Sequence, residues 1–409
     1  MKRRQFLGLG VGAVACVAAT AWARPRLWNP CRAALPPALA RHSLVREAWD
    51  GIDAAQVWDS HVHIAGTGDS DSGIVVGPQL SSPLHPVQYV QRLFYMNAGC
   101  THDAPGRVDA SYVERMRNLV DGFPPGAKLL LLAFDWFHDD AGMPQPASSA
   151  FYVPDTYARR LVLQYPDAFE WAASIHPYRA DAVAALEAAA VQGARAVKWL
   201  PAAMNIDPAS ARCEAFYAAA ARLGMPLIVH CGEEKAVHGA NTQQLGNPLR
   251  LRRPLDHGVR IVVAHCASAG EDVDLDRGSD GPVVPSFELF ARLMDEPRYE
   301  KLLHADISAL TQRNRAGTPL RTVLERREWH GRLLNGSDYP LPGILPLFSP
   351  SALAADGLLD PAAVLPLEAI REHNPLLFDF VLKRHLRVGG AGLSPAVFET
   401  RRFFVKETS

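Results

Sequence analysis

The chain has 409 residues, and its 42 Lys plus Arg against 43 Asp plus Glu give a formal net charge of −1. A hydrophobic content of 48% and a charged content of 21% are typical of a soluble globular protein with a sizeable core. The sequence has no basic stripe with interleaved aromatic residues, so the charge pattern argues against a nucleic-acid partner.

The first residues predict an export signal. Lys2, Arg3 and Arg4 precede a stretch without charged residues over 6–23, which ends in the small-x-small sequence Ala21-Trp22-Ala23. The paired arginines resemble a bacterial twin-arginine signal, although Lys2 stands where that pattern prefers Ser or Thr. We therefore predict a signal over 1–23 and an exported protein, periplasmic or extracellular. The alternative is an uncleaved signal that anchors the chain in the membrane; no other stable membrane partner is expected.

The rest of the chain is predicted to form one domain. Residues 24–50 are a lead-in segment with a helix near 39–49, the domain spans 51–390, and 391–409 form a C-terminal tail. Within the domain, short apolar runs alternate with longer stretches of helical periodicity, which predicts parallel strands joined by crossover helices. The predicted strands are Val57–Ile64, Lys128–Asp135, Phe169–His176, Ala194–Leu200, Pro226–Cys231, Arg260–Cys266, Leu302–Leu310 and Leu333–Asp338.

Helical patterns lie between these runs. Eight strand–helix units in one order favour a closed (β/α)8 TIM barrel, in the α/β class, over an open doubly wound sheet. Long loops after the first, fifth and sixth strands would then lie at the carboxyl end of the barrel, where active sites form. The predicted helices are 86–98, 109–120, Asp155–Gln164, Asp181–Gln192, Ala209–Leu223, Phe287–Asp295 and Leu320–Trp329.

The six cysteines form no C-x-x-C pair, so a thiolate zinc site is not predicted. Cys231 and Cys266 each follow a histidine in an apolar strand, and we expect both to be small buried residues that point away from that histidine. The sequence identifies no disulfide.

A pair of histidines closes the first strand. In a strand, residues two apart face the same way, so His61 and His63 both point into the barrel if either does. Imidazole suits zinc and related metals. Taken alone the pair is a weak signal, since such histidines are more often surface or core residues.

The positions of other polar residues strengthen this signal. His230 ends the fifth run, His265 ends the sixth, Asp338 ends the eighth, and Lys198 lies near the end of the fourth. In a barrel these side chains would gather with the first two histidines at one rim. His176 ends the third run and is a candidate substrate contact, with packing as the more common role for such a residue.

At these residues the sequence resembles the amidohydrolase superfamily, specifically its amidohydrolase-related branch, which includes hydrolases and metal-dependent decarboxylases. The resemblance covers about residues 55–385. The matching motifs are Asp59-Ser60-His61-Val62-His63, Tyr165-Pro166-Asp167-Ala168-Phe169, Ala173-Ser174-Ile175-His176-Pro177, Ala196-Val197-Lys198, His230, His265, Gly336-Ser337-Asp338-Tyr339-Pro340 and Asn374-Pro375.

The resemblance implies roles for these residues. His61, His63 and His230 would bind a first metal ion, with Asp338 as a further ligand or the general base. His265 would bind a second ion or polarise the substrate. Lys198 would be a carbamylated bridge between two ions or a plain ammonium group near the substrate. Zinc is the first choice for one or two ions, with manganese and iron as alternatives.

We therefore predict an exported metal-dependent hydrolase that acts on an amide, ester or lactone bond of a small-molecule substrate; homo-oligomer formation stays open. The first alternative is a decarboxylase of the same superfamily, which an arginine aimed at a substrate carboxylate would favour. A catalytically silent metal-binding envelope protein is the second, but it should have lost Asp338 or a histidine ligand, and this chain keeps them. The candidate arginines are Arg179, Arg250, Arg252 and Arg253.

Overall fold

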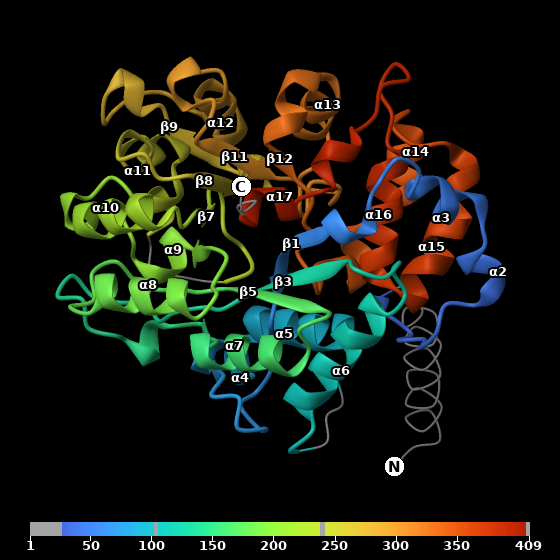
Figure 1. Ribbon diagram of the computed structural model, residues 1–409, viewed down its shortest axis with the longest axis horizontal. Helices are drawn as coiled ribbons and strands as arrows, with labels where there is room; N and C mark the ends of the chain where they lie inside the picture. Colours follow the sequence, from blue (N-terminus) through green and yellow to red (C-terminus); the bar gives the residue numbers. More distant parts are fainter. Residues whose placement is uncertain (1–26, 102–104, 238–241, 406–409) are drawn as a thin grey trace, which may run out of the picture.

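Eight parallel strands form a closed ring in the computed structural model, which describes residues 27–101, 105–237 and 242–405 (Figure 1). The predicted signal over 1–23 lies outside the described residues. The ring confirms the predicted TIM barrel. Its strands are β1 (Trp58–His63), β3 (Lys128–Leu132), β5 (Phe169–Ala172), β6 (Val197–Trp199), β7 (Leu227–His230), β8 (Ile261–Ala264), β11 (Leu303–Asp306) and β12 (Leu333–Leu334).

Two seams close the ring. The strands pair in parallel in the orders β1-β3-β5 and β6-β7-β8-β11-β12. A parallel bridge between Ala173 and Val197 joins β5 to β6, and one between Val62 and Tyr339 joins β1 to the segment after β12. With both seams formed, the barrel has no free sheet edge, and every strand delivers its carboxyl end to the same rim.

Every strand of the barrel lies inside a predicted run, but most end earlier than predicted. The run Leu302–Leu310, for example, leaves the sheet after Asp306. Beyond that point the Ser308 amide donates to the Asp306 side chain at 3.1 Å instead of continuing the strand ladder. The last residues of the apolar runs therefore build the rim of the barrel.

Helices surround the strands (Figure 1). Helices α5 and α7 (Asp155–Gln164) have the predicted bounds, and the other helices predicted between the strands differ by a few residues at one or both ends. The lead-in helix predicted near 39–49 is two short helices. The long first loop carries α4 to α6. The remaining helices are α4 (Pro78–Ser81), α5 (Pro86–Ala98), α6 (Val108–Val120), α8 (Ala182–Val191), α9 (Pro201–Met204), α10 (Glu214–Leu223), α11 (Arg252–Asp256), α12 (Ser286–Met294), α13 (Thr318–Glu325), α14 (Pro350–Ala355), α15 (Val364–His373) and α16 (Pro375–His385).

Two short pairs of antiparallel strands lie outside the barrel. Strand β2 (Val75–Val76) pairs with β4 (Phe151–Tyr152), and β9 (Glu271–Val273) pairs with β10 (Val283–Pro285). Both pairs belong to loops that follow barrel strands.

The lead-in segment packs on the closing helices. Its helices α2 (Pro37–Ala40) and α3 (Ser43–Ala48), blue in Figure 1, lie beside the red-orange α15 and α16. The Arg384 guanidinium donates to the carbonyl of Ala48 at 2.7 Å and to that of Asp50 at 2.9 Å. The segment is therefore part of the folded domain.

The predicted C-terminal tail, as far as residue 405, also belongs to the folded domain. Helix α17 (Arg401–Phe404) places Phe403 and Phe404 against Trp58 and the inward-facing residues of other strands. The amide of Trp58 donates to the Thr400 hydroxyl at 3.2 Å. Since the inside of a TIM barrel is a packed core, these aromatic rings fill the end opposite the rim.

A disulfide joins Cys31 of the lead-in segment to Cys100 in the first loop. The sequence did not identify this pair, because its partners are 69 residues apart and belong to irregular segments. Cys231 and Cys266 are buried and free, as predicted. In the described part of the chain, no helix combines the length and hydropathy needed for a membrane span.

Candidate metal centre

The six residues predicted as metal ligands or catalytic groups all line one cavity at the carboxyl rim of the barrel. The cavity has a volume of about 340 Å³, which falls in the usual range for small-molecule sites. Barrel closure thus gathers side chains that are up to 277 residues apart (338 − 61). The six are His61, His63, Lys198, His230, His265 and Asp338.

Three of them form a compact group. His61, His265 and Asp338 each offer a ligand atom within 4.8 Å of the others. The Asp338 carboxylate lies 3.6 Å from His61 Nε2 and 3.8 Å from His265 Nε2. His63 is next to the group, with its Nε2 3.1 Å from Asp338 Oδ1. Neutral imidazoles and one carboxylate that face a common point fit a divalent metal ion.

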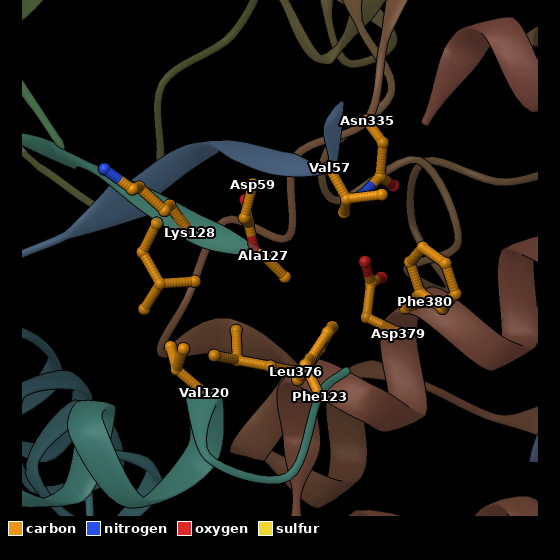
Figure 2. Close-up of a pocket in the computed structure, with 11 residues that line it drawn as sticks. Val57, Asp59, Val120, Phe123, Ala127, Lys128, Asn335, Leu376, Asp379 and Phe380 are labelled. Carbon is orange, nitrogen blue, oxygen red and sulfur yellow. The ribbon is translucent and has the colours of Figure 1, made fainter. Parts of the chain in front are cut away.

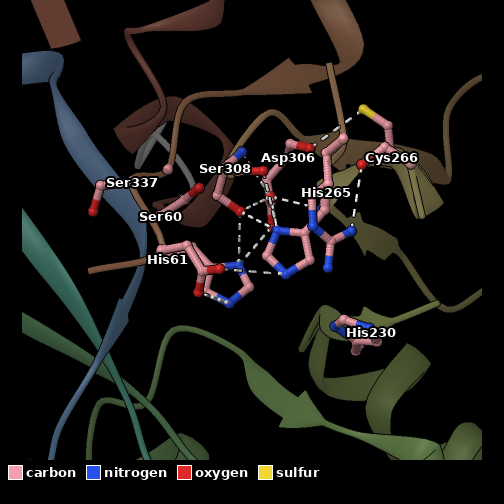
Figure 3. Close-up of polar contacts among 12 residues, drawn as sticks. Ser60, His61, His230, His265, Cys266, Asp306, Ser308 and Ser337 are labelled. Atoms are coloured by element: carbon pink, nitrogen blue, oxygen red, sulfur yellow. Dashed lines mark hydrogen bonds and ion pairs between the residues drawn. The ribbon is translucent and has the colours of Figure 1, made fainter. Parts of the chain in front are cut away.

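The orientation of His61 is set from behind by Asp306. His61 Nδ1 donates to Asp306 Oδ2 at 2.8 Å, which leaves the Nε2 lone pair directed at the centre. His265 is held in the same way, because its Nδ1 lies 3.1 Å from the Ser308 carbonyl oxygen. Figure 3 shows the two rings under Asp306 and Ser308, with the Cys266 sulfur pointing away. A carboxylate or carbonyl behind each ring fixes its tautomer, as is usual for metal-binding histidines.

The charges at the centre suit metal binding. Burial lowers the pKa of His61, of His265 and of His230, that of His230 to about 4, so these imidazoles are neutral at neutral pH. Burial raises the pKa of Asp306, but His61, His265 and the Ser308 hydroxyl outweigh burial and bring this pKa below its usual range. Neutral imidazoles and an ionised carboxylate are the forms that bind a cation.

His230 enters from β7 and meets Glu234 of the following loop. Its Nε2 lies 3.3 Å from Glu234 Oε2, yet this buried nitrogen has no hydrogen-bond partner among the described residues. Glu234 is itself held by the loop, since its other oxygen accepts from the Val237 amide at 2.9 Å. A buried nitrogen without a partner that faces the cavity is the kind of atom that a cation would satisfy.

Lys198 reaches the centre from β6. Its side chain is 1% exposed, and its Nζ lies 3.2 Å from His61 Nε2. Burial lowers the pKa of Lys198, although Asp306 and Asp338 oppose this effect. The Lys198 amine therefore lies at the centre itself, and when it is protonated its charge repels a cation there.

The backbone that carries Asp338 is fastened to β1. The Asp338 amide donates to the His61 carbonyl at 2.8 Å, and the His63 amide donates to the Tyr339 carbonyl at 2.9 Å. Gly336 permits this close approach, because a Cβ atom there would lie 2.7 Å from the His61 Cβ. The relative placement of His61 and Asp338 is thus a direct product of backbone hydrogen bonds.

Behind this seam lies a second layer of buried charge. Asp59 Oδ1 accepts from the amides of His61 at 3.2 Å and Ser337 at 2.8 Å, while burial raises the pKa of Asp59 to about 6. Lys383 donates to Asp379 Oδ2 and to the Gly336 carbonyl, each at 2.6 Å. Asp59 and Asp379 line a cavity behind the strands, which has a volume of about 10 Å³. Figure 2 shows both side chains. This layer supports the turn that presents Asp338.

The sequence matches the model of the amidohydrolase family over residues 58–371. The chain belongs to the amidohydrolase family. The match covers β1 to α15 and so includes all six residues at the centre. Membership makes this protein an enzyme. No curated relative matches the sequence.

Several solved structures are similar to the amidohydrolase. An uncharacterized TIM-barrel protein from Bordetella bronchiseptica has a TM-score of 0.44 at 15% identity, over 70% of this chain and 86% of that chain. A probable 2-pyrone-4,6-dicarboxylic acid hydrolase from Acinetobacter baumannii has a TM-score of 0.41 at 14% identity, over 70% and 84%. The 5-carboxyvanillate decarboxylase from Sphingomonas paucimobilis has a TM-score of 0.40 at 13% identity, over 85% and 98%.

Other candidates from the sequence lie elsewhere in the amidohydrolase. His176 is fully buried, its Nε2 lies 2.8 Å from the Met204 carbonyl oxygen, and its ring stacks on His138 at 4.3 Å. It is not among the residues that line the cavity. The four candidate arginines do not line the cavity either, because each is paired with a carboxylate elsewhere. The pairs are Arg179–Asp181, Arg250–Asp207, Arg252–Asp276 and Arg253–Glu214.

Sequence reasoning missed the residues that act from behind the centre. Asp306 falls in the middle of the predicted run Leu302–Leu310. The only signal for its role was that an acidic residue lies inside an apolar strand. It also missed Gln312 and Arg315, which line the cavity from the loop after β11. Nothing in that polar loop distinguishes them without the fold.

The Asp306→Asn variant tests the role of the carboxylate behind His61. An amide has no negative charge to hold the His61 tautomer, so we expect the affinity for a divalent metal, with zinc as the probe, to fall roughly 10- to 100-fold. Competition with a chromophoric zinc chelator measures this change. Asp272→Asn is the matched control, because Asp272 is also buried and bonded to a serine, Ser286, away from the centre. Equal zinc affinities of wild type and Asp306→Asn would contradict the assignment.

Proposed function

We propose that the enzyme is a zinc-dependent hydrolase acting on an amide, ester or lactone bond of a small substrate. The observation that carries the proposal is the Asp338 carboxylate among imidazoles in the cavity, 3.6 Å from His61 Nε2 and 3.1 Å from His63 Nε2. When bound, a zinc ion lowers the pKa of water and polarises a carbonyl group. Manganese and iron share the ligand preference, so metal analysis decides the identity.

We propose that His61, His63, His230 and Asp338 hold the ion. The Nε2 of His230, which makes no hydrogen bond among the described residues, supports its place in this set. His265 is left to act on the reacting groups. Its Nδ1 lies 2.8 Å from the Ser308 hydroxyl and 3.1 Å from the Ser308 carbonyl oxygen. With the hydrogen on Nδ1, its Nε2 presents a lone pair to the cavity and can accept a proton.

Asp338 is suited to move a proton. Burial raises its pKa, but His265, His63 and His61 together bring the pKa well below its usual range, so the carboxylate is ionised. Its side chain is 6% exposed and touches three imidazoles. An ionised carboxylate at this point can take a proton from attacking water and return it to the leaving group.

A decarboxylase remains the second candidate. The specific observation in its favour is Arg315, a guanidinium group at the wall of the same cavity. It is the kind of group that would hold the carboxylate of an acid substrate. In that reaction the same acid–base groups would deliver a proton to carbon.

The Asp338→Asn variant tests the reaction. The amide cannot accept the proton, and we expect kcat to fall at least roughly 100-fold, the usual contribution of a general base. The purified zinc-loaded enzyme and the variant are assayed against panels of esters, lactones and aromatic carboxylic acids. Activity in the first two panels identifies a hydrolase, and carbon dioxide release in the third identifies a decarboxylase. Equal rates for the two proteins would remove Asp338 from the mechanism.

Zinc content separates the roles of the two remaining histidines. We expect His230→Ala to lose bound zinc and His265→Ala to keep about one zinc per chain while losing activity, because only the former removes a ligand. Zinc is measured by elemental analysis after gel filtration. Loss of zinc in His265→Ala with retention in His230→Ala would exchange their roles. A wild-type protein that binds no zinc, manganese or iron would contradict the whole scheme.

We also propose that the enzyme is exported. The twin-arginine-like sequence supports this, and so does the Cys31–Cys100 disulfide, since structural disulfides persist in oxidising compartments. In a bacterial host, we expect wild type in the periplasm, shortened by loss of residues 1–23. The double variant Arg3→Lys/Arg4→Lys should stay in the cytoplasm. Arg24→Lys/Arg26→Lys is the control beyond the cleavage site. Fractionation with mass spectrometry decides, and unshortened cytoplasmic wild type would contradict export.

A further inference from the structure

The polar groups of the cavity fall into two classes, those with partners and those without. Glu233 is paired with Lys235 at 2.9 Å, and Glu234 accepts from loop amides. Arg315 differs, because no carboxylate of the described residues lies within ion-pair distance of it. Its one side-chain hydrogen bond in the described structure is a contact of 3.4 Å with the Ser268 hydroxyl. A half-buried guanidinium group at the substrate cavity thus lacks a counter-charge.

Gln312 provides a second, independent observation. Its side chain is only 4% exposed and lines the same cavity. Its amide nitrogen Nε2 is buried and has no hydrogen-bond partner among the described residues. Buried amide donors in native proteins are nearly always satisfied, so one that is left open at a cavity indicates a ligand acceptor.

The loop that carries both residues is held by backbone hydrogen bonds. The backbone amide of Gln312 donates to the Ala309 carbonyl at 2.9 Å, and the backbone amide of Arg315 donates to the backbone carbonyl of Gln312 at 2.9 Å. The Arg313 amide donates to Leu347 at 2.9 Å, which ties the loop to the segment before α14. Donors that are held in place before binding lose little conformational entropy when a ligand arrives.

The ligand chemistry follows from these donors. A guanidinium fork and a primary amide offer several N–H groups and a single positive charge, and a carboxylate is a planar acceptor with a single negative charge. A neutral ligand would leave the charge of Arg315 uncompensated beside apolar walls that include Phe134, Phe151 and Leu347. A phosphate dianion would exceed the charge that this loop supplies.

We propose that Gln312 and Arg315 form a subsite that binds a carboxylate group of the substrate, apart from the metal ligands. The inference deepens the proposed function and rests on it only in taking this cavity as the substrate site. The positive charge of Arg315 also acts on the imidazoles of His230 and His265, so the subsite lies near the reacting centre. The substrate is then an organic acid with an apolar body, and its carboxylate fixes which bond faces Asp338.

Binding of benzoate and of its neutral counterpart benzamide tests the subsite by calorimetry. Because zinc can itself bind a carboxylate, each titration is run on the zinc-loaded full chain and again on metal-depleted protein. We expect wild type to prefer benzoate in both forms. In Arg315→Ala, benzoate affinity should fall roughly 10- to 100-fold, the scale of a hydrogen bond to a charged group, while benzamide affinity stays unchanged. Gln312→Leu keeps the shape and should lose a smaller factor.

Arg313→Ala is the matched control, since Arg313 is exposed, two residues away, and absent from the cavity lining. It should bind benzoate like wild type. Equal benzoate affinity in wild type and Arg315→Ala, or no benzoate binding by either, overturns the proposal. The metal-depleted titration is readable even if the protein holds no zinc, so failure of the metal scheme and failure of the subsite are separate results.

Discussion

The closing seam of the barrel is the interaction on which the site depends. The first strand and the segment after the last one are joined by backbone hydrogen bonds, and two of these involve the residues that face the metal centre. The Asp338 amide donates to the His61 carbonyl, and the His63 amide donates to the Tyr339 carbonyl. The hydrogen bonds that close the ring therefore also bring His61 and His63 to the Asp338 carboxylate. A substitution that opened the seam would disperse the site together with the fold.

The site holds buried charge and a strained backbone in the same place. His265, Cys266 and Ala267 have φ values of 55°, 51° and 48°, and Asp338 has φ of 61°, all in the left-handed region that non-glycine residues rarely adopt. Each such residue costs about 1–3 kcal/mol, which the surrounding structure must offset. Asp306 contributes part of the stabilisation that offsets this cost, because its carboxylate accepts from the His265 amide at 3.0 Å as well as from the His61 ring. One buried carboxylate thus fixes a ring and a strained turn.

Much of this arrangement could be predicted from the sequence. Alternating apolar runs indicated all eight strands, and the polar residues at their ends indicated the rim, because a parallel barrel sends every carboxyl end the same way. The contribution of Asp306 could not be predicted, since an acidic residue in an apolar run has no visible partner before the strands are placed. Arg315 was missed for a related reason. Arginines such as Arg250 seemed equally suitable until the fold paired them with surface carboxylates.

The side of the cavity that helix α5 forms is held in place by other contacts than the strand ends that carry His61 and Asp338. Helix α5 contributes Arg92 and Tyr95 to the cavity but adds no strand to the barrel. At its carboxyl end it is fastened by the Cys31–Cys100 disulfide and by the Asn97 side chain, which accepts from the Asn29 amide at 2.8 Å.

On its other side, the Tyr95 hydroxyl contacts the Ala236 carbonyl at 3.4 Å, in the loop that carries Glu234. Crosslinks between loops, rather than sheet hydrogen bonds, thus set the position of this wall. An oxidising compartment preserves such a crosslink. The proposed export and the shape of the cavity are for this reason physically connected: an oxidising compartment would preserve the disulfide, and the disulfide holds a helix of the cavity wall.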